Sequence, residues 1–176
     1  MVDIQTELIR LCGKQDPVAQ KQLYQMYSKA MYNICLRMLV HKQDAEDVLQ
    51  DAFIKVFRSI ETFRGDSTPG AWIKRIVINK CVDHLNKRGK DWIDVEDIND
   101  PVEDEPSGTE LNPAAINKAI NELPDGCRAV FNLKILEGYD HNEIAEILSI
   151  SVGTSKSQLS RAKELLRFSL LKTIEL

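Results

Sequence analysis

Apolar residues recur along most of the chain at three- and four-residue intervals, and few stretches alternate with period two. Such spacing places one apolar stripe along a helix and is typical of helical proteins. At three of the predicted helix starts, a side chain that suits a helix N-cap stands directly before a proline, which is favoured at the first helical position. These pairs are Asp16-Pro17, Thr68-Pro69 and Asn112-Pro113. The pattern therefore predicts an all-helical chain with well-marked helix starts.

The predicted helices fall into two groups. The first group covers about 17–40, 44–60 and 69–88, and the second covers about 113–122 and 125–137, followed by a helix pair within 138–167. Asp44 is predicted to cap the helix over 44–60, and Val48, Ala52, Val56 and Ile60 are predicted to face its interior. Gly89 follows the end of the helix over 69–88, as expected of a helix C-terminus.

Residues 138–167 carry the most informative pattern, two short helices around a tight turn. Ile144, Ile147 and Leu148 form one apolar stripe, the turn lies at 148–150, and Ser151 is placed to cap the second helix. The inner positions of that helix are 152, 155, 159, 162 and 166, among which Ser155 is polar. This is the layout of a helix-turn-helix, whose second helix lies in the DNA major groove. The alternative from this segment alone is an ordinary pair of solvated helices.

Charge divides the chain into three parts. Residues 91–110 hold nine acidic and no basic residues, with two prolines and a glycine, while residues 1–90 carry 15 Lys and Arg against 10 Asp and Glu. Such composition without periodicity is typical of a linker. We therefore predict two small helical domains, 1–90 and 112–176, joined by a flexible acidic linker over 91–111.

A second group of candidate residues lies at 63–90. Residues 74–90 hold six basic residues against the single acid Asp83, and such a strip can follow a phosphate backbone. The preceding polar loop, 63–67, stands beside Phe63 and could bind an unstacked base. The alternative is a solvated basic helix end after a routine turn.

The helix over 44–60 carries more apolar residues than one stripe requires, which favours a second face covered by a partner. Its first turns hold Asp44, Glu46, Asp47 and Asp51. Acids there suit the helix dipole, and they could equally meet a basic partner surface.

Other classes of protein find little support. Four separate cysteines and three histidines give no metal-ligand spacing, and no nucleophile or cofactor pattern occurs, so we predict no metal, no cofactor, no small-molecule substrate and no enzymatic activity. No apolar run approaches the ~20 residues of a membrane span, and the N-terminus lacks a signal-peptide pattern. A cytoplasmic location with reduced, buried thiols is expected.

The two motif blocks together resemble a known family. DAEDVLQDAFIKVFRSIETFRGDSTPGAWIKRIVINKCVDHLNKR resembles region 2 of the bacterial sigma factors of the extracytoplasmic-function (ECF) group, in the sigma-70 family. LPDGCRAVFNLKILEGYDHNEIAEILSISVGTSKSQLSRAKELLR resembles their region 4. The resemblance covers about residues 8–170, in the family's order and with its acidic linker. It implies a factor that binds core RNA polymerase and directs promoter-specific initiation.

The resemblance also implies roles for individual residues. Docking on the clamp helices of the polymerase β′ subunit is expected of Asp47, Gln50, Asp51, Ile54, Lys55 and Phe57. Reading and melting of the −10 element is expected of Phe63, Arg64, Asp66, Ser67, Lys74, Arg75, Ile76, Asn79 and Lys80, with a flipped base near Phe63 and with Ile76 and Asn79 along the pocket wall. Reading of the −35 element is expected of Thr154, Lys156, Ser157, Gln158, Ser160 and Arg161, with Thr154 holding a phosphate.

The implied partners are core RNA polymerase, through its β′ clamp helices and β flap, promoter DNA and an anti-sigma factor. Such a factor is often membrane-bound and would hold the chain at the inner membrane face. The chain departs from the family's usual residues at Ser149, Ser155, Gln158 and Pro69-Gly70, which leaves its promoter sequences open. Two alternatives remain, a sigma mimic that sequesters an anti-sigma factor and a helix-turn-helix regulator that is not a sigma factor.

Overall fold

The computed structural model describes residues 4–88 and 112–174, and every regular element within these ranges is helical. The chain divides into an N-terminal unit, residues 1–88, and a C-terminal unit, residues 89–176. The prediction of an all-α chain built from two helical bodies is confirmed for the described residues. The predicted linker over 91–111 lies outside them. Each unit is described by itself below.

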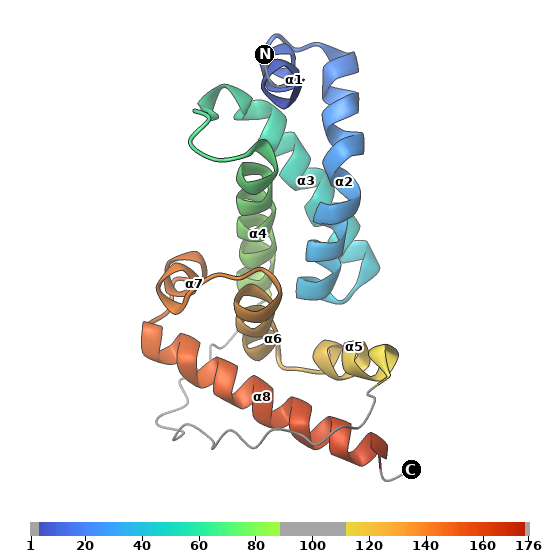
Figure 1. Cartoon of the computed structure of the whole chain (residues 1–176), viewed down its shortest axis with the longest axis vertical. Helices are drawn as coiled ribbons and strands as arrows, with labels where there is room; N and C mark the ends of the chain where they lie inside the picture. The colour runs from blue at the N-terminus through green and yellow to red at the C-terminus, as the bar shows by residue number, and fades with distance from the viewer. Residues whose placement is uncertain (1–3, 89–111, 175–176) are drawn as a thin grey trace. The chain divides into compact units, whose positions relative to one another are not determined.

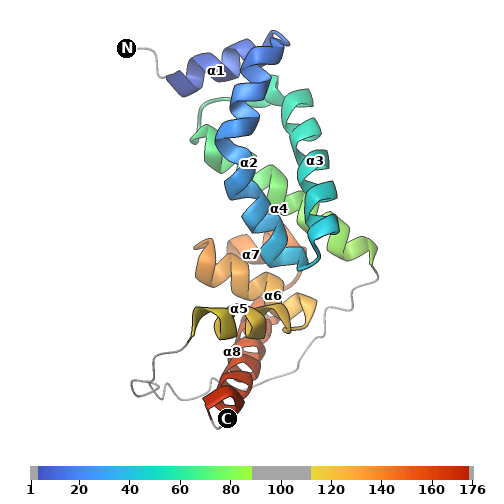
Figure 2. The ribbon, with the colours of Figure 1, turned by 90° about the vertical axis from the view of Figure 1, so that its right-hand side faces the viewer.

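The N-terminal unit contains four α-helices, α1 (Ile4–Gly13), α2 (Pro17–Leu39), α3 (Lys42–Arg58) and α4 (Pro69–Lys87), with a short 3-10 helix, η1 (Ile60–Thr62). Helices α2, α3 and α4 pack against one another in pairs, and α1 packs on α2 near η1 (Figures 1 and 2). The buried side chains of the unit are all apolar within the described residues. Burial of these apolar stripes is what drives the helices together.

Two of the predicted helix starts are present in this unit. The Asp16 carboxylate accepts hydrogen bonds from the backbone N–H groups of Val18, at 2.8 Å, and Ala19, at 3.2 Å. The Thr68 hydroxyl oxygen accepts one from the N–H of Ala71 at 3.2 Å. Each cap satisfies donors that the first helical turn leaves unpaired, so both predictions are confirmed.

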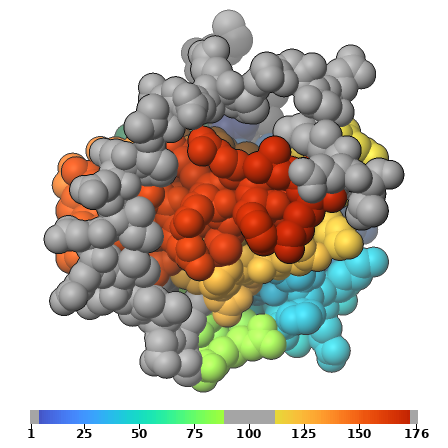
Figure 3. Space-filling view, turned by 90° about the horizontal axis from the view of Figure 1, so that it is seen from below, coloured from blue at the N-terminus to red at the C-terminus, as the bar shows by residue number. Residues whose placement is uncertain are grey.

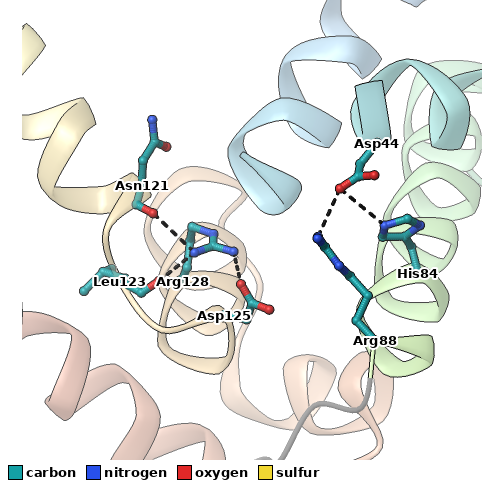
Figure 4. A network of polar contacts seen from close by, with 7 residues as sticks. All are labelled: Asp44, His84, Arg88, Asn121, Leu123, Asp125 and Arg128. Atoms are coloured by element: carbon teal, nitrogen blue, oxygen red, sulfur yellow. Dashed lines mark hydrogen bonds and ion pairs between the residues drawn. The ribbon is translucent and has the colours of Figure 1, made fainter. Parts of the chain in front are cut away.

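The predicted cap at Asp44 is wrong. Helix α3 begins at Lys42, because α2 and α3 are joined by only Val40 and His41, and His41 at the N-cap position makes no side-chain cap bond. Asp44 lies in the first turn instead. Its Oδ2 lies 3.0 Å from Arg88 Nη1 and 3.7 Å from His84 Nε2, so it connects the start of α3 to the end of α4 (Figure 4).

The C-terminal unit contains α5 (Pro113–Asn121), α6 (Asp125–Phe131), α7 (His141–Leu148) and α8 (Val152–Ile174), with α6 continued by a π-helical turn, η2 (Asn132–Leu136). Helices α5, α6 and α7 each pack against the long α8. Figure 3 shows one side of α8, in orange to red, with α5 in yellow beside it. The side-chain oxygen of Asn112 accepts a hydrogen bond from the backbone N–H of Ala114 at 3.0 Å, which confirms the third predicted cap.

The interior of the C-terminal unit contains polar side chains as well as apolar ones. Its buried polar side chains are Arg128, Asn132, Thr154, Ser155 and Gln158. The Arg128 guanidinium donates to the backbone oxygens of Leu123, at 2.6 Å, and Asn121, at 3.4 Å, and forms an ion pair with Asp125 (Figure 4). It therefore satisfies carbonyls that α5 leaves unpaired where it ends.

Candidate nucleic-acid interface

The first helix of the predicted helix-turn-helix, α7, begins at a capping box. The Asp140 carboxylate accepts from the N–H groups of Asn142, at 2.8 Å, and Glu143, at 2.9 Å, and the Glu143 carboxylate accepts from the N–H of Asp140 at 2.8 Å. These reciprocal bonds fix the direction in which α7 starts.

The turn between α7 and α8 is built by two serines. Ser149 adopts the left-handed conformation, with φ 55° and ψ 46°. The Ser151 hydroxyl oxygen accepts from the N–H of Thr154 at 2.9 Å, as a helix cap does. Both the turn and the cap were predicted from the sequence, and both predictions are confirmed.

Lys156 and Arg161 are two of the exposed cations of α8, which also include Lys163 and Arg167. Arg161 donates to the Glu164 carboxylate at 2.6 Å, an exposed pair that competes only weakly with a phosphate or a base. The half-buried Ser157 hydroxyl donates to backbone oxygens of its own helix, at 3.1 Å from those of both Gly153 and Thr154. A DNA strand facing α8 would therefore meet Lys156 and Arg161 first.

Behind this face, α7 and α8 are connected through His141, whose Nδ1 lies 2.8 Å from the Ser155 hydroxyl. Burial lowers the pKa of His141, and the nearby charges of Lys134 and Lys156 lower it further, while Asp140 acts in the opposite direction. The imidazole is therefore held neutral at neutral pH and bonds the one polar residue on the predicted inner stripe of α8.

In the N-terminal unit, one face of α3 is open to solvent. The exposed residues on it are Asp47, Gln50, Asp51, Ile54 and Lys55, and Phe57 is half-buried. Ile54 is 43% exposed, and the Phe57 ring lies 6.1 Å from that of the buried Phe53. A large apolar side chain between exposed carboxylates is the composition of a protein-docking surface.

The loop between η1 and α4 carries the side chains predicted to hold a base. Arg64, Asp66 and Ser67 are exposed, and the half-buried Phe63 packs on Trp72 of α4 with the ring centroids 5.6 Å apart. This ring contact, together with the Thr68 cap, fixes the loop to the first turn of α4. The loop thereby keeps a defined position next to the basic strip.

A groove of about 750 Å³ lies beside this loop. One wall is the loop from Phe63 to Pro69 with η1, and the other wall is α1, through Gln5, Thr6, Ile9, Arg10 and Gly13. Along α4 beyond the groove, Arg75 and Asn79 are exposed, and Lys74, Ile76 and Lys80 are half-buried. The loop, the groove and the basic strip thus belong to one unit, where a single nucleic-acid strand could contact all three.

Comparison with known proteins assigns the family. The family model for sigma-70 region 2 matches residues 23–91, and that for sigma-70 region 4 matches residues 114–166. The chain is 33% identical over 174 residues to the ECF RNA polymerase sigma factor SigW of Bacillus subtilis, covering 90% of this chain and 92% of the relative. It is 30% identical over 172 residues to the RNA polymerase sigma-H factor of Pseudomonas aeruginosa, with 90% and 89% covered.

The chain belongs to the ECF sigma factors of the sigma-70 family. A solved structure agrees with this assignment, that of the sigma factor RpoE of Bartonella quintana in complex with the anti-sigma factor NepR. It has a TM-score of 0.58 and 26% sequence identity, covering 85% of this chain and 95% of that one.

Three residues of this sigma factor expected to read the −35 element are not on the outer face. Gln158 is only 3% exposed, and its Oε1 accepts from the Cys127 thiol at 3.0 Å. Thr154 is 7% exposed, with its hydroxyl 2.8 Å from that of Ser151, and the Ser160 hydroxyl oxygen is buried. Gln158 and Thr154 are thus turned inward, against α6 and the turn, and Ser160 is half-buried, while contact of these three residues with DNA stays a prediction.

The sequence interpretation also missed α1 in this sigma factor. Helix α1 supplies one wall of the groove, and Ile76 and Asn79 lie on α4 outside it, so their expected place along the wall of a base pocket stays a prediction. The signal was present, since Leu8, Ile9 and Cys12 are buried and recur at helical spacing. The packing of α1 beside η1, which creates the groove, could not be predicted from the sequence.

The remaining chemistry of this sigma factor is inert where the structure describes it. All four cysteines are free and buried, and burial together with the neighbouring Cys35 side chain raises the pKa of Cys81. Between residues 4 and 88 and between 112 and 174, no group of three His, Cys, Asp or Glu side chains is placed to hold a metal ion. In the same ranges, no helix has the length and apolarity that crossing a bilayer requires.

Proposed function

We propose that this ECF sigma factor binds core RNA polymerase in the bacterial cytoplasm and directs initiation at promoters that carry a −35 and a −10 element. The observation that carries the proposal is that each of its two sigma regions presents a surface suited to DNA. The second region presents Lys156 and Arg161 on the outer face of a capped helix-turn-helix, and the first presents a polar loop continuous with a basic helix.

For the −35 element, the N-terminal half of α8 would enter the major groove. Lys156 and Arg161 are long enough to reach base edges or phosphates, and Arg can bind guanine with two hydrogen bonds. Ser157 lies between them on the same face, where its hydroxyl can contact a neighbouring base. Thr154, Gln158 and Ser160 would act from behind by fixing the rotation of α8, since their polar atoms are turned inward.

For the −10 element, the loop at 63–68 would capture a base that has left the duplex, with Phe63 as the apolar contact. Arg64, Asp66 and Ser67 provide donors and acceptors for its edge. Lys74, Arg75 and Lys80 would hold phosphates of the same strand, and Ile76 and Asn79 would contact the strand beyond the groove. Capture of an unstacked base stabilises the separated strands and therefore favours melting.

For the polymerase, the exposed face of α3 would dock on the β′ clamp helices through Asp47, Gln50, Asp51, Ile54, Lys55 and Phe57. The C-terminal unit would contact the β flap, and its exposed Ile135 and Leu136, 50% and 46% exposed on η2, suit a protein partner. An anti-sigma factor is a further partner that we propose by analogy with the solved complex of the Bartonella quintana sigma factor. Where that factor is membrane-bound, it would hold the chain at the inner membrane face.

The test is reconstitution of the purified chain with bacterial core RNA polymerase and transcription from a pool of genomic promoter fragments. Start sites that share a −35 and a −10 motif are expected. Core binding without any transcription would contradict initiation by this factor with that polymerase, and loss of both would favour a sigma mimic. DNA binding without core binding would favour a regulator that is not a sigma factor.

Two sets of variants separate the two roles. Lys156→Ala with Arg161→Ala should weaken −35-dependent transcription and leave core affinity unchanged, whereas Asp51→Lys should weaken core binding. The charge-matched controls are Lys118→Ala with Lys172→Ala for the first and Glu122→Lys for the second, all at exposed residues away from both surfaces. Loss of core binding in the Lys156 and Arg161 variant, or unchanged core affinity in Asp51→Lys, would contradict the assignment.

A further inference from the structure

The groove beside the −10 loop has two walls of different origin. The loop wall comes from the segment predicted to hold a flipped base, and the facing wall comes from α1, for which no role was predicted. Helix α1 is held firmly in place, because Leu8, Ile9 and Cys12 are buried in the N-terminal unit. The α1 wall is therefore a fixed part of the groove.

The groove is large for a single base. Its volume of about 750 Å³ falls within the range of roughly 300–1,000 Å³ that holds whole drug-sized ligands. At the end of α1, Gly13 lines the groove beside η1, where an added Cβ would be in ordinary contact with an Ile60 methyl carbon at 3.9 Å. A base captured by the loop at 63–68 thus leaves space between that base and α1.

The lining has the chemistry of a nucleotide site. The half-buried Phe63 provides apolar surface for the flat face of a base, above the buried Ile9 and Ile60, while the exposed Thr6 presents a hydroxyl for its edge. Arg10 on α1 and Arg64 on the loop place a guanidinium on each rim, and guanidinium groups bind phosphate oxygens in bidentate fashion.

Arg10 forms an ion pair with Glu7, and this pair is weak enough to be exchanged for another. The Glu7 carboxylate accepts two hydrogen bonds from it, at 2.5 and 2.8 Å. These bonds raise the pKa of Arg10 and lower the pKa of Glu7. Both side chains are exposed to solvent, where ion pairs stabilise little. An incoming phosphate can therefore replace Glu7 at modest cost.

We propose that the groove holds a second nucleotide of the displaced promoter strand, next to the base captured by the loop, and that α1 reads it. Thr6 contacts the edge of this base, and Arg10 leaves Glu7 to bind its phosphate. The inference rests on the proposed function and extends it, because it assigns part of −10 specificity to a helix outside the loop and the basic strip.

The test uses the reconstituted holoenzyme and fork-junction promoter DNA in which each nucleotide of the −10 region of the displaced strand is replaced in turn by an abasic one. The wild-type holoenzyme should lose affinity at two neighbouring positions. At one of them, removing the base and substituting Thr6→Ala should be non-additive. At the other, the non-additive partner should be Phe63→Ala.

The charge variants test the phosphate contact. Arg10→Gln should weaken binding about fivefold, as loss of one charge-assisted hydrogen bond does. Glu7→Gln should strengthen it, and Lys21→Gln, at an exposed cation of α2 that does not line the groove, serves as the control for net charge. Equal effects of Arg10→Gln and Lys21→Gln, or additivity of Thr6→Ala with base removal at every position, would overturn the α1 assignment.

Failure of the wider proposal gives a different result. If the wild-type holoenzyme shows no dependence on any base of the −10 region, the sigma function itself is wrong, and the inference falls with it. If the loop position behaves as expected and the α1 position does not, only the inference is wrong.

Discussion

The two units of this sigma factor present their binding surfaces from interiors of opposite character. The N-terminal unit has only apolar buried side chains among its described residues, whereas the C-terminal unit buries Arg128, Asn132, Thr154, Ser155 and Gln158. An apolar interior tolerates substitutions that conserve volume, because its contacts are non-directional. A polar interior allows few arrangements, since each donor and acceptor needs a partner in a particular direction.

This difference corresponds to what each surface has to do. Under the proposed function, α8 would have to present Lys156 and Arg161 at a fixed rotation, and the bonds of Ser155 and Gln158 on its inner side would hold that rotation. The N-terminal surface is instead positioned by helix caps and by the Phe63–Trp72 contact at the edge of the unit. Its interior therefore needs to supply stability more than angular precision.

Among the variants that test this difference between the two interiors, Arg128→Met is expected to have the largest effect. This variant leaves the carbonyls of Leu123 and Asn121 without a donor and Asp125 without its ion pair, and we expect a loss of about 3 kcal/mol in the C-terminal unit. Ile73→Val is the matched change in the apolar interior, with an expected cost of about 1 kcal/mol. Native-state hydrogen exchange, resolved by unit, measures both. Equal losses would mean that the polar interior is no more demanding than the apolar one.

Gln158→Ala tests the contribution of one buried polar side chain within α8. Removal of the buried amide leaves the Cys127 thiol without its acceptor, and we expect a loss of about 1–2 kcal/mol in the stability of the C-terminal unit. Base preference at the −35 element should not change, because the side chain does not face outward. Denaturant titration and selection from a randomised −35 library give the two readouts. A changed base preference with unchanged stability would return Gln158 to the DNA-contacting set.

Outside the interiors, the two units should respond alike. Gln15 and Ser149 are both exposed and both left-handed, with φ of 61° and 55°. Glycine adopts this conformation without the cost of about 1–2 kcal/mol that a side chain incurs, although part of the gain is lost to the greater entropy of the unfolded chain. Gln15→Gly and Ser149→Gly should each stabilise by up to about 1 kcal/mol. Differential scanning calorimetry measures both, and Ser67→Gly in an exposed loop is not expected to stabilise.

The smallest expected effect is a pH dependence confined to the C-terminal unit. Because the pKa of His141 is lowered in the folded state, the unfolded chain binds more protons near and below the ordinary imidazole pKa of about 6.5. The contribution of the neutral ring is therefore complete above that value and is lost as the pH falls toward the folded pKa. Hydrogen exchange in the C-terminal unit should show a decline in stability below about pH 6.5. The same decline in His141→Gln would exclude this residue as its cause.

Local features of the fold were predictable from the sequence, and features that join distant segments were not. The Asp16, Thr68 and Asn112 caps and the turn at 148–150 depend on neighbours within a few residues, and all were found. Asp44 was misassigned because its partner, Arg88, lies 44 residues away.

Residues of the proposed binding surfaces were likewise predictable where local spacing determines their position, and not where a distant segment does. Lys156 and Arg161 were correctly placed outward from helical spacing, since charged side chains are seldom buried without a partner. Gln158 was misplaced because a glutamine suits either environment and only the position of Cys127 on α6 decides between them. The groove was missed for the same reason, because it exists only where α1 packs beside η1.

The Asp44–Arg88 contact and the Asn112 cap also fix the two ends of the connecting chain. The path from residue 88 to residue 112 contains 24 Cα–Cα steps, counted as 112 minus 88, and a fully extended chain of that length spans at most roughly 80 Å. One turn of B-DNA rises about 34–36 Å. This length limits only the distance between the end of α4 and the start of α5, and the extent of each unit adds to the separation that the two DNA-facing surfaces could reach. Because a tether permits every shorter distance, the linker alone would not select one spacing between the elements, and under the proposed function that selectivity would come from the polymerase.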